Sequence, residues 1–214
     1  WDKDTDPETL GQKPVRTWVF ATDEDGFCYY DERFKVSGDE LFLSPTGKAT
    51  LPIGTITIQE TKAPEGYHIN PELFVVQITP EGNDQFVSTY NQPIIPEAIL
   101  QLELLKKQAG TDVVIPDTEF THTLPNGTTE ILSTDENGKL TIKGLTRGKH
   151  KLQETKVTDG YLLNGNVLEF NVAEDNKITL LSSTDDSEGK VKFEITKEGN
   201  ISIVVEDKLA PFQL

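Results

Sequence analysis

Two glutamates at matching places in the chain are the side chains best suited to chemistry. Glu60 and Glu154 each lie in a Gln-Glu-Thr-Lys sequence that is followed, three residues later, by Gly-Tyr. Ile58 and Leu152 stand two places before them. Because side chains alternate between the faces of a strand, each glutamate should share the core face with its apolar neighbour. Burying an unpaired charge is costly, so this repetition indicates that each carboxyl group has a partner or a chemical role.

The elements that would hold these glutamates are strands. Helical periodicity is almost absent, whereas alternating apolar and polar residues between turn sequences predominate, so we predict an all-β protein. Besides the strand of Glu60, the first half should contain strands at 16–21, 27–30, 73–79 and 85–91. Besides the strand of Glu154, the second half should contain strands at 99–106, 119–124, 128–132, 140–142, 167–172, 178–181, 190–195 and 201–207.

The repeat predicts two domains, 1–96 and 97–214, which suits a chain of 214 residues. Pro93 and Pro96 are typical of a short, stiff linker between them. A Thr-Asp-Glu turn precedes both glutamates, but the interval is longer in the first copy, which predicts an insertion within 22–60. Few residues precede that first turn, so part of the first domain's start is expected to lie outside this sequence.

The composition excludes several classes of partner and cofactor. A net charge of −16 argues against binding to nucleic acid or to an anionic membrane surface and indicates a solvated exterior. Cys28 is the only cysteine, so no disulfide can form within the chain. No apolar run is long enough to span a bilayer, and there is no signal peptide and no methionine. We therefore expect an excised piece of a larger protein.

No metal or cofactor is predicted. The three histidines lack metal-ligand spacing, and no phosphate-binding loop or nucleophile elbow occurs. Asp2, Asp4 and Asp6 alternate as in a calcium loop. However, Pro7 stands where such a loop needs glycine and Lys13 where it needs a bidentate glutamate, so a polar loop is favoured.

The sequence Gln-Glu-Thr-Lys-Ala-Pro-Glu-Gly-Tyr at 59–67 resembles the E-box of Cna B-type, prealbumin-like domains, which occur in pilins and adhesins of Gram-positive bacteria. Residues 116–120 and 203–207 resemble the opening and the closing strand of such a domain, and 90–93 resembles the closing strand of another. The resemblance implies two tandem immunoglobulin-like, prealbumin-like β-sandwiches. It also implies that each contains a spontaneous isopeptide bond, in which a first-strand lysine joins a last-strand Asn or Asp and the E-box glutamate promotes the reaction.

In the second domain the matching residues are Lys106, Asp207 and the promoter Glu154. Alternation is compatible with this set, since each shares a strand face with apolar residues, although a shift of one residue would bury Lys107 instead. In a dry pocket desolvation favours a neutral, nucleophilic amine and a protonated carboxyl group, and the reaction would release water. We expect the E-box strand to lie between the first and last strands.

In the first domain Asn91 and Glu60 match the resemblance, and the reaction would release ammonia. Three alternatives remain for this domain: the lysine is Lys3, the lysine lies before Trp1, or the bond is absent.

The function implied is structural. The chain would be a stalk or spacer segment of an extracellular, cell-wall-attached adhesin or pilin. Its partners would be neighbouring domains of the parent protein, and its chemistry a single self-modification rather than turnover. The alternative is an adhesin module that recognises a host protein or glycan through the first-domain insertion. The aromatic residues in and beside that insertion, which could instead fill the core, are Trp18, Phe27, Tyr29, Tyr30 and Phe42.

Overall fold

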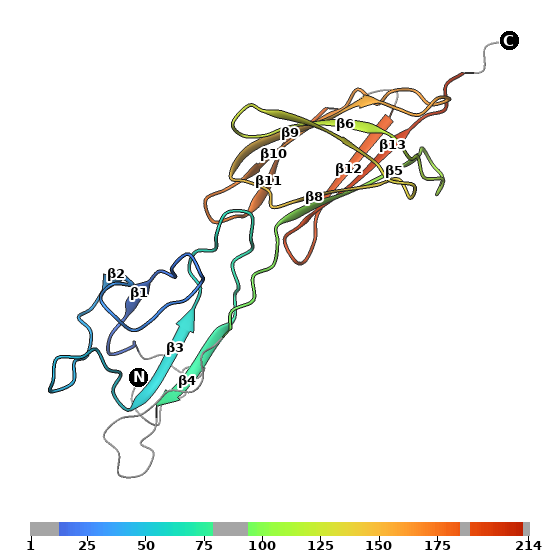
Figure 1. Ribbon diagram of the computed structural model, residues 1–214. Helices are drawn as coiled ribbons and strands as arrows, with labels where there is room; N and C mark the ends of the chain where they lie inside the picture. Colours follow the sequence, from blue (N-terminus) through green and yellow to red (C-terminus); the bar gives the residue numbers. More distant parts are fainter. Residues whose placement is uncertain (1–12, 79–93, 185–188, 212–214) are drawn as a thin grey trace. The chain divides into compact units, whose positions relative to one another are not determined.

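The computed structural model describes residues 13–78, 94–184 and 189–211, and these contain thirteen strands and no helix (Figure 1). The prediction of an all-β fold is therefore confirmed. The chain forms two compact units, Trp1–Gln59 with Pro71–Ile95, and Glu60–Asn70 with Pro96–Leu214. Thus the first E-box segment, Glu60–Asn70, belongs to the second unit. No helix capable of crossing a lipid bilayer occurs in the described ranges.

The described strands of the first unit form two antiparallel pairs, β1 (Trp18–Phe20) with β2 (Lys35–Gly38) and β3 (Gly54–Gln59) with β4 (Leu73–Ile78). The strand expected at 27–30 is absent. Residue 27 instead belongs to a turn, because the Asp23 carboxylate accepts hydrogen bonds from the backbone N–H groups of Asp25 and Phe27. The strand predicted at 85–91 lies outside the described residues.

The second unit is a sandwich of two facing sheets (Figure 1). The five-stranded sheet has the order β11 (Ile178–Ser183), β10 (Val167–Val172), β9 (Gly148–Lys156), β6 (Glu119–Thr123) and β7 (Thr129–Ser133). The four-stranded sheet has the order β12 (Gly189–Ile195), β13 (Ile201–Asp207), β5 (Gln101–Gln108) and β8 (Lys139–Lys143). The two sheets enclose a single apolar core, to which β5 and β13 contribute alternate residues.

The first and last strands of this unit, β5 and β13, are direct neighbours and run parallel. The expectation that the E-box strand lies between them is wrong, because β9 belongs to the facing sheet. Glu154 therefore approaches across the core rather than along the sheet. Facing sheets pack roughly 10 Å apart, a gap that inward-pointing side chains bridge.

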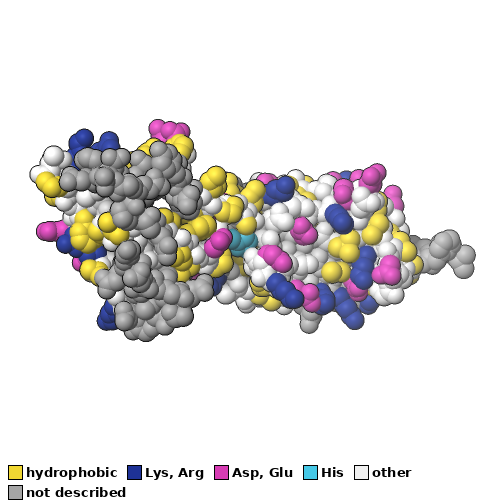
Figure 2. Space-filling view, turned by 90° about the horizontal axis from the view of Figure 1, so that it is seen from below, with side chains coloured by type: hydrophobic (Ala, Val, Ile, Leu, Met, Phe, Trp, Pro, Cys, Tyr) yellow, Lys and Arg dark blue, Asp and Glu magenta, His cyan; other side chains and the backbone are white. Residues whose placement is uncertain are grey.

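The surface of the second unit carries charge of both signs. On the face shown in Figure 2, acidic and basic side chains are interspersed. Surface ion pairs include Lys149 with Glu169 at 2.9 Å and Lys192 with Glu194 at 2.6 Å. Such exposed pairs contribute little to stability, so their main effect is a well-solvated exterior.

Two stacked histidines lie in the core of the sandwich. His150 Nε2 is 2.7 Å from the Thr146 carbonyl oxygen, which can only accept, so this nitrogen carries the proton. The other His150 nitrogen, Nδ1, lies 2.9 Å from Nε2 of His122, whose own Nδ1 lies 2.8 Å from a Glu130 carboxylate oxygen. Burial lowers the pKa of His150, and the neighbouring His122 adds to this effect.

This depressed pKa makes the contribution of His150 to stability depend on pH. A base whose pKa is lower when folded contributes stability above its unfolded pKa, near 6.5, that is lost as the pH falls below it. Carboxyl groups with raised pKa values, such as Glu154, contribute with the opposite sign over this range, so the test is a difference: between pH 7 and pH 5, the free energy of unfolding in urea should change less favourably in the native protein than in a His150→Gln variant. A His68→Gln variant, altered outside this stack, should keep the native pH dependence. An equal change with pH in native protein and His150→Gln would contradict this assignment.

Candidate functional site

Strand β5 places Lys106 in the interior of the sandwich. The side chains of Leu102, Leu104 and Lys106 alternate with outward-facing residues, and Lys106 is completely buried. The next residue, Lys107, lies on the outer face, with its Nζ 3.3 Å from a Glu206 carboxylate oxygen. The register that would have buried Lys107 is therefore not adopted.

Two carboxyl groups meet the buried amine from opposite sheets. Asp207, the last residue of β13, is fully buried and accepts a hydrogen bond from Lys106 Nζ through Oδ1. Glu154 on β9 is 2% exposed and accepts a second hydrogen bond from the same Nζ through Oε2. The Phe120 ring centroid lies 6.0 Å from that nitrogen. The structure thus brings together the three residues that the sequence singled out in the second domain.

Burial controls the charges in this cluster. Desolvation raises the pKa of Glu154 to about 7, although the Lys106 ammonium opposes the shift. Desolvation likewise raises the pKa of Asp207. A carboxyl group with a raised pKa readily holds a proton near neutral pH, so it can donate a hydrogen bond or take a proton from an amine. The other Asp207 oxygen, Oδ2, has no hydrogen-bond partner within the described residues.

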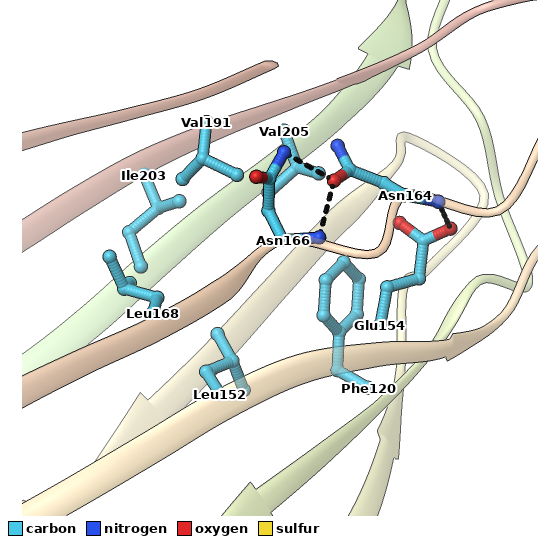
Figure 3. A pocket seen from close by; sticks show the side chains of 9 residues that line it. All are labelled: Phe120, Leu152, Glu154, Asn164, Asn166, Leu168, Val191, Ile203 and Val205. Carbon is cyan, nitrogen blue, oxygen red and sulfur yellow. Dashed lines mark hydrogen bonds between the residues drawn. The ribbon is translucent and has the colours of Figure 1, made fainter. Parts of the chain in front are cut away.

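Asn164 and Asn166 complete the surroundings of Glu154 (Figure 3). The Asn164 backbone N–H donates to Glu154 Oε1 at 3.1 Å, and the Asn164 side-chain oxygen accepts two hydrogen bonds from Asn166. These asparagines were not predicted as site residues. A signal exists, however, because an asparagine follows the E-box glutamate by ten positions in both copies, at Asn70 and Asn164.

The cavity beside these residues is small. Its volume of about 10 Å³ is near the minimum for one water molecule. Its wall is polar at Glu154, Asn164 and Asn166 and apolar elsewhere (Figure 3). A space of this size has no room for an organic substrate or cofactor.

The first E-box glutamate has different surroundings. Glu60 lies one residue beyond the end of β3 and is only half-buried, and Ile58 is 36% exposed. The prediction that Glu60 shares a buried core face with Ile58 is therefore wrong, since the strand ends before it. Glu60 Oε2 accepts a hydrogen bond from the Asn70 backbone N–H at 2.6 Å. Partial burial and the Glu60 carboxyl group raise the pKa of Glu97 to about 7.

The remaining predicted crosslinking residues, Lys3 and Asn91, lie outside the described residues, as does the acidic segment with Asp2, Asp4 and Asp6. In the part of the chain that is described, no group of three or more His, Cys, Asp or Glu side chains is suited to a metal ion.

The first-unit aromatics divide into a packed and an exposed set. The Trp18 ring packs edge-on against Tyr30 and Phe42, with centroids 5.2 Å and 5.9 Å away. Phe27 and Tyr29 are more than half exposed. The aromatic surface available for recognition is therefore smaller than the sequence suggested.

Comparison with known families decides the classification. The sequence matches the SpaA prealbumin-like fold domain twice, over residues 11–93 and 101–187. The chain belongs to this prealbumin-like family. Two tandem SpaA-type domains account for the internal repeat and for the sandwich of the second unit. No curated protein shows a significant sequence match to the chain.

Solved structures that are similar to this chain include a Bacillus anthracis protein and two pilus adhesins. The Bacillus anthracis TIE protein is 22% identical, with 91% of this chain and 31% of that chain covered and a TM-score of 0.42. A C-terminal fragment of the pilus adhesin SpaC from Lactobacillus rhamnosus GG is 18% identical, with 85% and 86% covered and a TM-score of 0.45. The Streptococcus pneumoniae pilus adhesin RrgA is 20% identical, with 56% and 16% covered and a TM-score of 0.42. This chain thus spans about a third of the TIE chain and a sixth of the RrgA chain.

Proposed function

We propose that this chain is a structural stalk or spacer segment of a Gram-positive cell-wall-attached adhesin or pilin, stabilised by an autocatalytic isopeptide bond between Lys106 and Asp207. The observation that carries the proposal is the complete burial of an amine between two carboxyl groups with raised pKa values. A buried ion pair is weak support for stability, which leaves its chemistry as the better explanation.

The reaction balances within the cluster. The Lys106 ammonium passes one proton to the Asp207 carboxylate along their hydrogen bond, and the neutral amine then attacks the Asp207 carboxyl carbon. Glu154 in its protonated form donates a hydrogen bond to an Asp207 oxygen and polarises the carbonyl. It then gives its own proton to the departing hydroxyl oxygen of Asp207 and takes one from the attacking nitrogen in its place, so that one water leaves and an amide remains. Glu154 ends as it began.

Positioning supplies much of the rate. Aligned groups in a fixed site react as if at about 10⁵ M or more, and this proximity adds to the contribution of Glu154. Hydrogen bonds already join the Lys106 nitrogen to both carboxyl groups, and Asn164 holds the other Glu154 oxygen at 3.1 Å.

The bond would carry mechanical load. Lys106 and Asp207 lie 101 positions apart on the first and last strands of the sandwich, which are parallel neighbours. A covalent link between them prevents tension at the two ends of this domain from extending the chain between them. In the first domain, the equivalent proposal joins Asn91 to Lys3 or to a lysine before Trp1, with Glu60 as promoter.

Intact-mass spectrometry under denaturing conditions tests the proposal. We expect the protein to be lighter than its sequence by one water, and by one ammonia in addition if Asn91 has reacted. Proteolysis should release a branched peptide that contains Lys106 and Asp207. A mass equal to that of the unmodified sequence would rule out the bond.

A further inference from the structure

The E-box loops of the two repeats have the same backbone pairing with the segment that follows each domain. Gly66 O accepts from the Leu100 N–H at 2.8 Å, and Gly160 O accepts from the Ala210 N–H at 2.8 Å. One residue further, Tyr67 forms an isolated bridge with Ile99, as Tyr161 does with Leu209. The segments 63–68 with 98–100 and 157–162 with 208–210 are therefore structural duplicates, which we name the first and the second E-box loop.

The first E-box loop is covered by turns of the second compact unit, to which it belongs. The Asn176 side-chain amide donates to Pro64 O at 3.1 Å and to Tyr67 O at 2.7 Å. Arg147 donates from its guanidinium to Ala63 O at 3.1 Å and from its backbone to a Glu65 carboxylate oxygen at 2.7 Å. The Asn176 side-chain oxygen Oδ1 accepts a hydrogen bond from Arg147 Nε at 2.9 Å, so the two donor side chains also hold each other in position.

Close packing accompanies these hydrogen bonds. A side chain at Gly66 would place its Cβ 3.1 Å from the Gly144 backbone, and Ala63 is 2% exposed. Leu100 O accepts from the backbone N–H groups of Gly144 and Leu145 at 2.9 Å and 3.2 Å. The first E-box loop is thus part of a closely packed interface with the turn before β9 and the turn between β10 and β11.

The second E-box loop has the same shape but lacks this cover. Val157, in the place of Ala63, is partly exposed, and a Cβ at Gly160 would meet no atom within 4 Å. Asp159, in the place of Glu65, is exposed and offers the same carboxylate chemistry. Among the described residues, no side-chain or turn donor reaches the carbonyl oxygens of Val157 and Ala210.

We infer that the second E-box loop is a docking surface for a further prealbumin-like domain, which presents an arginine and an asparagine in the positions of Arg147 and Asn176. The duplicate loop identifies this partner, because the same backbone acceptors and acidic side chain are satisfied by that donor pair in the first copy. A covalently continuous domain fits best, since Leu100 leads directly into β5 and Ala210 is its counterpart. The inference does not depend on the isopeptide bond.

Cysteine labelling in an extended chain tests this docking. The extended chain consists of residues 1–210 followed directly by a second copy of residues 101–210, so that Ala210 precedes β5 as Leu100 does. Val157→Cys is introduced in the first copy only, and exposed Cys28 serves as the internal reference. We expect alkylation of the new thiol, relative to Cys28, to be at least tenfold slower in the extended chain than in the 214-residue chain.

Two controls define the result. Ala63→Cys in the 214-residue chain gives the rate of a covered position, because Ala63 is 2% exposed. Arg147→Ala with Asn176→Ala, made only in the added copy, should restore fast labelling, and protease resistance reports whether that copy is folded. Labelling that is equally fast in both chains, whether or not the added copy folds, overturns the inference. So does protection that persists without the two donors.

Discussion

Replacing Lys106 by methionine is expected to prevent the loss of one water, so that the protein has the full mass of its sequence, and to lower its free energy of unfolding by several kcal/mol. By the chain-entropy relation for crosslinks, closing a loop of roughly 100 residues stabilises the folded state by about 4–5 kcal/mol. Lys106 and Asp207 enclose a loop of this length. Methionine has a similar volume and no charge, so the packing around Phe120 is largely kept. Denaturant unfolding followed by intact-mass analysis measures both effects on the same samples.

Lys107→Met is the matched control for this substitution. Lys107 is the neighbouring lysine on the same strand, but its side chain lies outside and pairs with Glu206. We expect this variant to keep the mass deficit and to change stability by less than about 1 kcal/mol, as for other surface ion pairs. Equal stability losses in the two variants, or a water deficit that persists without Lys106, would exclude the proposed link.

Replacing Glu154 by glutamine is expected to slow bond formation by about 10²- to 10⁴-fold, the usual contribution of a positioned general acid or base. The glutamine carbonyl can still accept from the Asn164 N–H, so the local hydrogen bond survives. A glutamine amide, however, cannot take the proton from the Lys106 nitrogen or return it to the leaving oxygen. The fraction of protein that has lost water, followed by mass spectrometry after purification, measures this rate.

Two further variants distinguish a role of Glu154 in bond formation from a role in the folding of the domain. Glu154→Ala should also retain the full sequence mass, whereas Glu206→Gln, beside the crosslink but on the outer face, should lose its water like the native chain. Circular dichroism of the unreacted Glu154→Gln protein should still show a folded β-sandwich. A complete water deficit in both Glu154 variants would mean that this carboxyl group is not the promoter.

Local sequence patterns were sufficient to predict the strands and most of the site of the second unit. Strands β10 and β13 have the predicted limits, 167–172 and 201–207. Lys106, Glu154 and Asp207 could be assigned to inner faces because the direction of a side chain along a strand is a local property with a period of two residues. The E-box resemblance then named the same three residues.

In the first unit, the local sequence pattern was not sufficient to predict the strands or the burial of Glu60. The segment 27–30 has aromatic residues typical of strands, but the Asp23 side chain organises a turn there. Glu60 and Glu154 both lie in a Gln-Glu-Thr-Lys sequence. However, β3 ends before Glu60, whereas β9 continues through Glu154 to Lys156. Identical local sequences therefore differ in burial because the neighbouring strands that cover them differ.

By itself, the sequence determined the all-β class, the two repeats and the strand faces of Lys106, Glu154 and Asp207, since each of these depends on residues close together in the chain. Only the tertiary structure decided that β5 and β13 pair in parallel, that Glu154 reaches them from the facing sheet, and that Asn164 holds the Glu154 carboxyl group. It also decided that Arg147 and Asn176 cover the first E-box loop and leave the second open. Strand pairing and loop docking depend on which surfaces can be buried together across the whole domain, and alternation along a single strand carries no information about them.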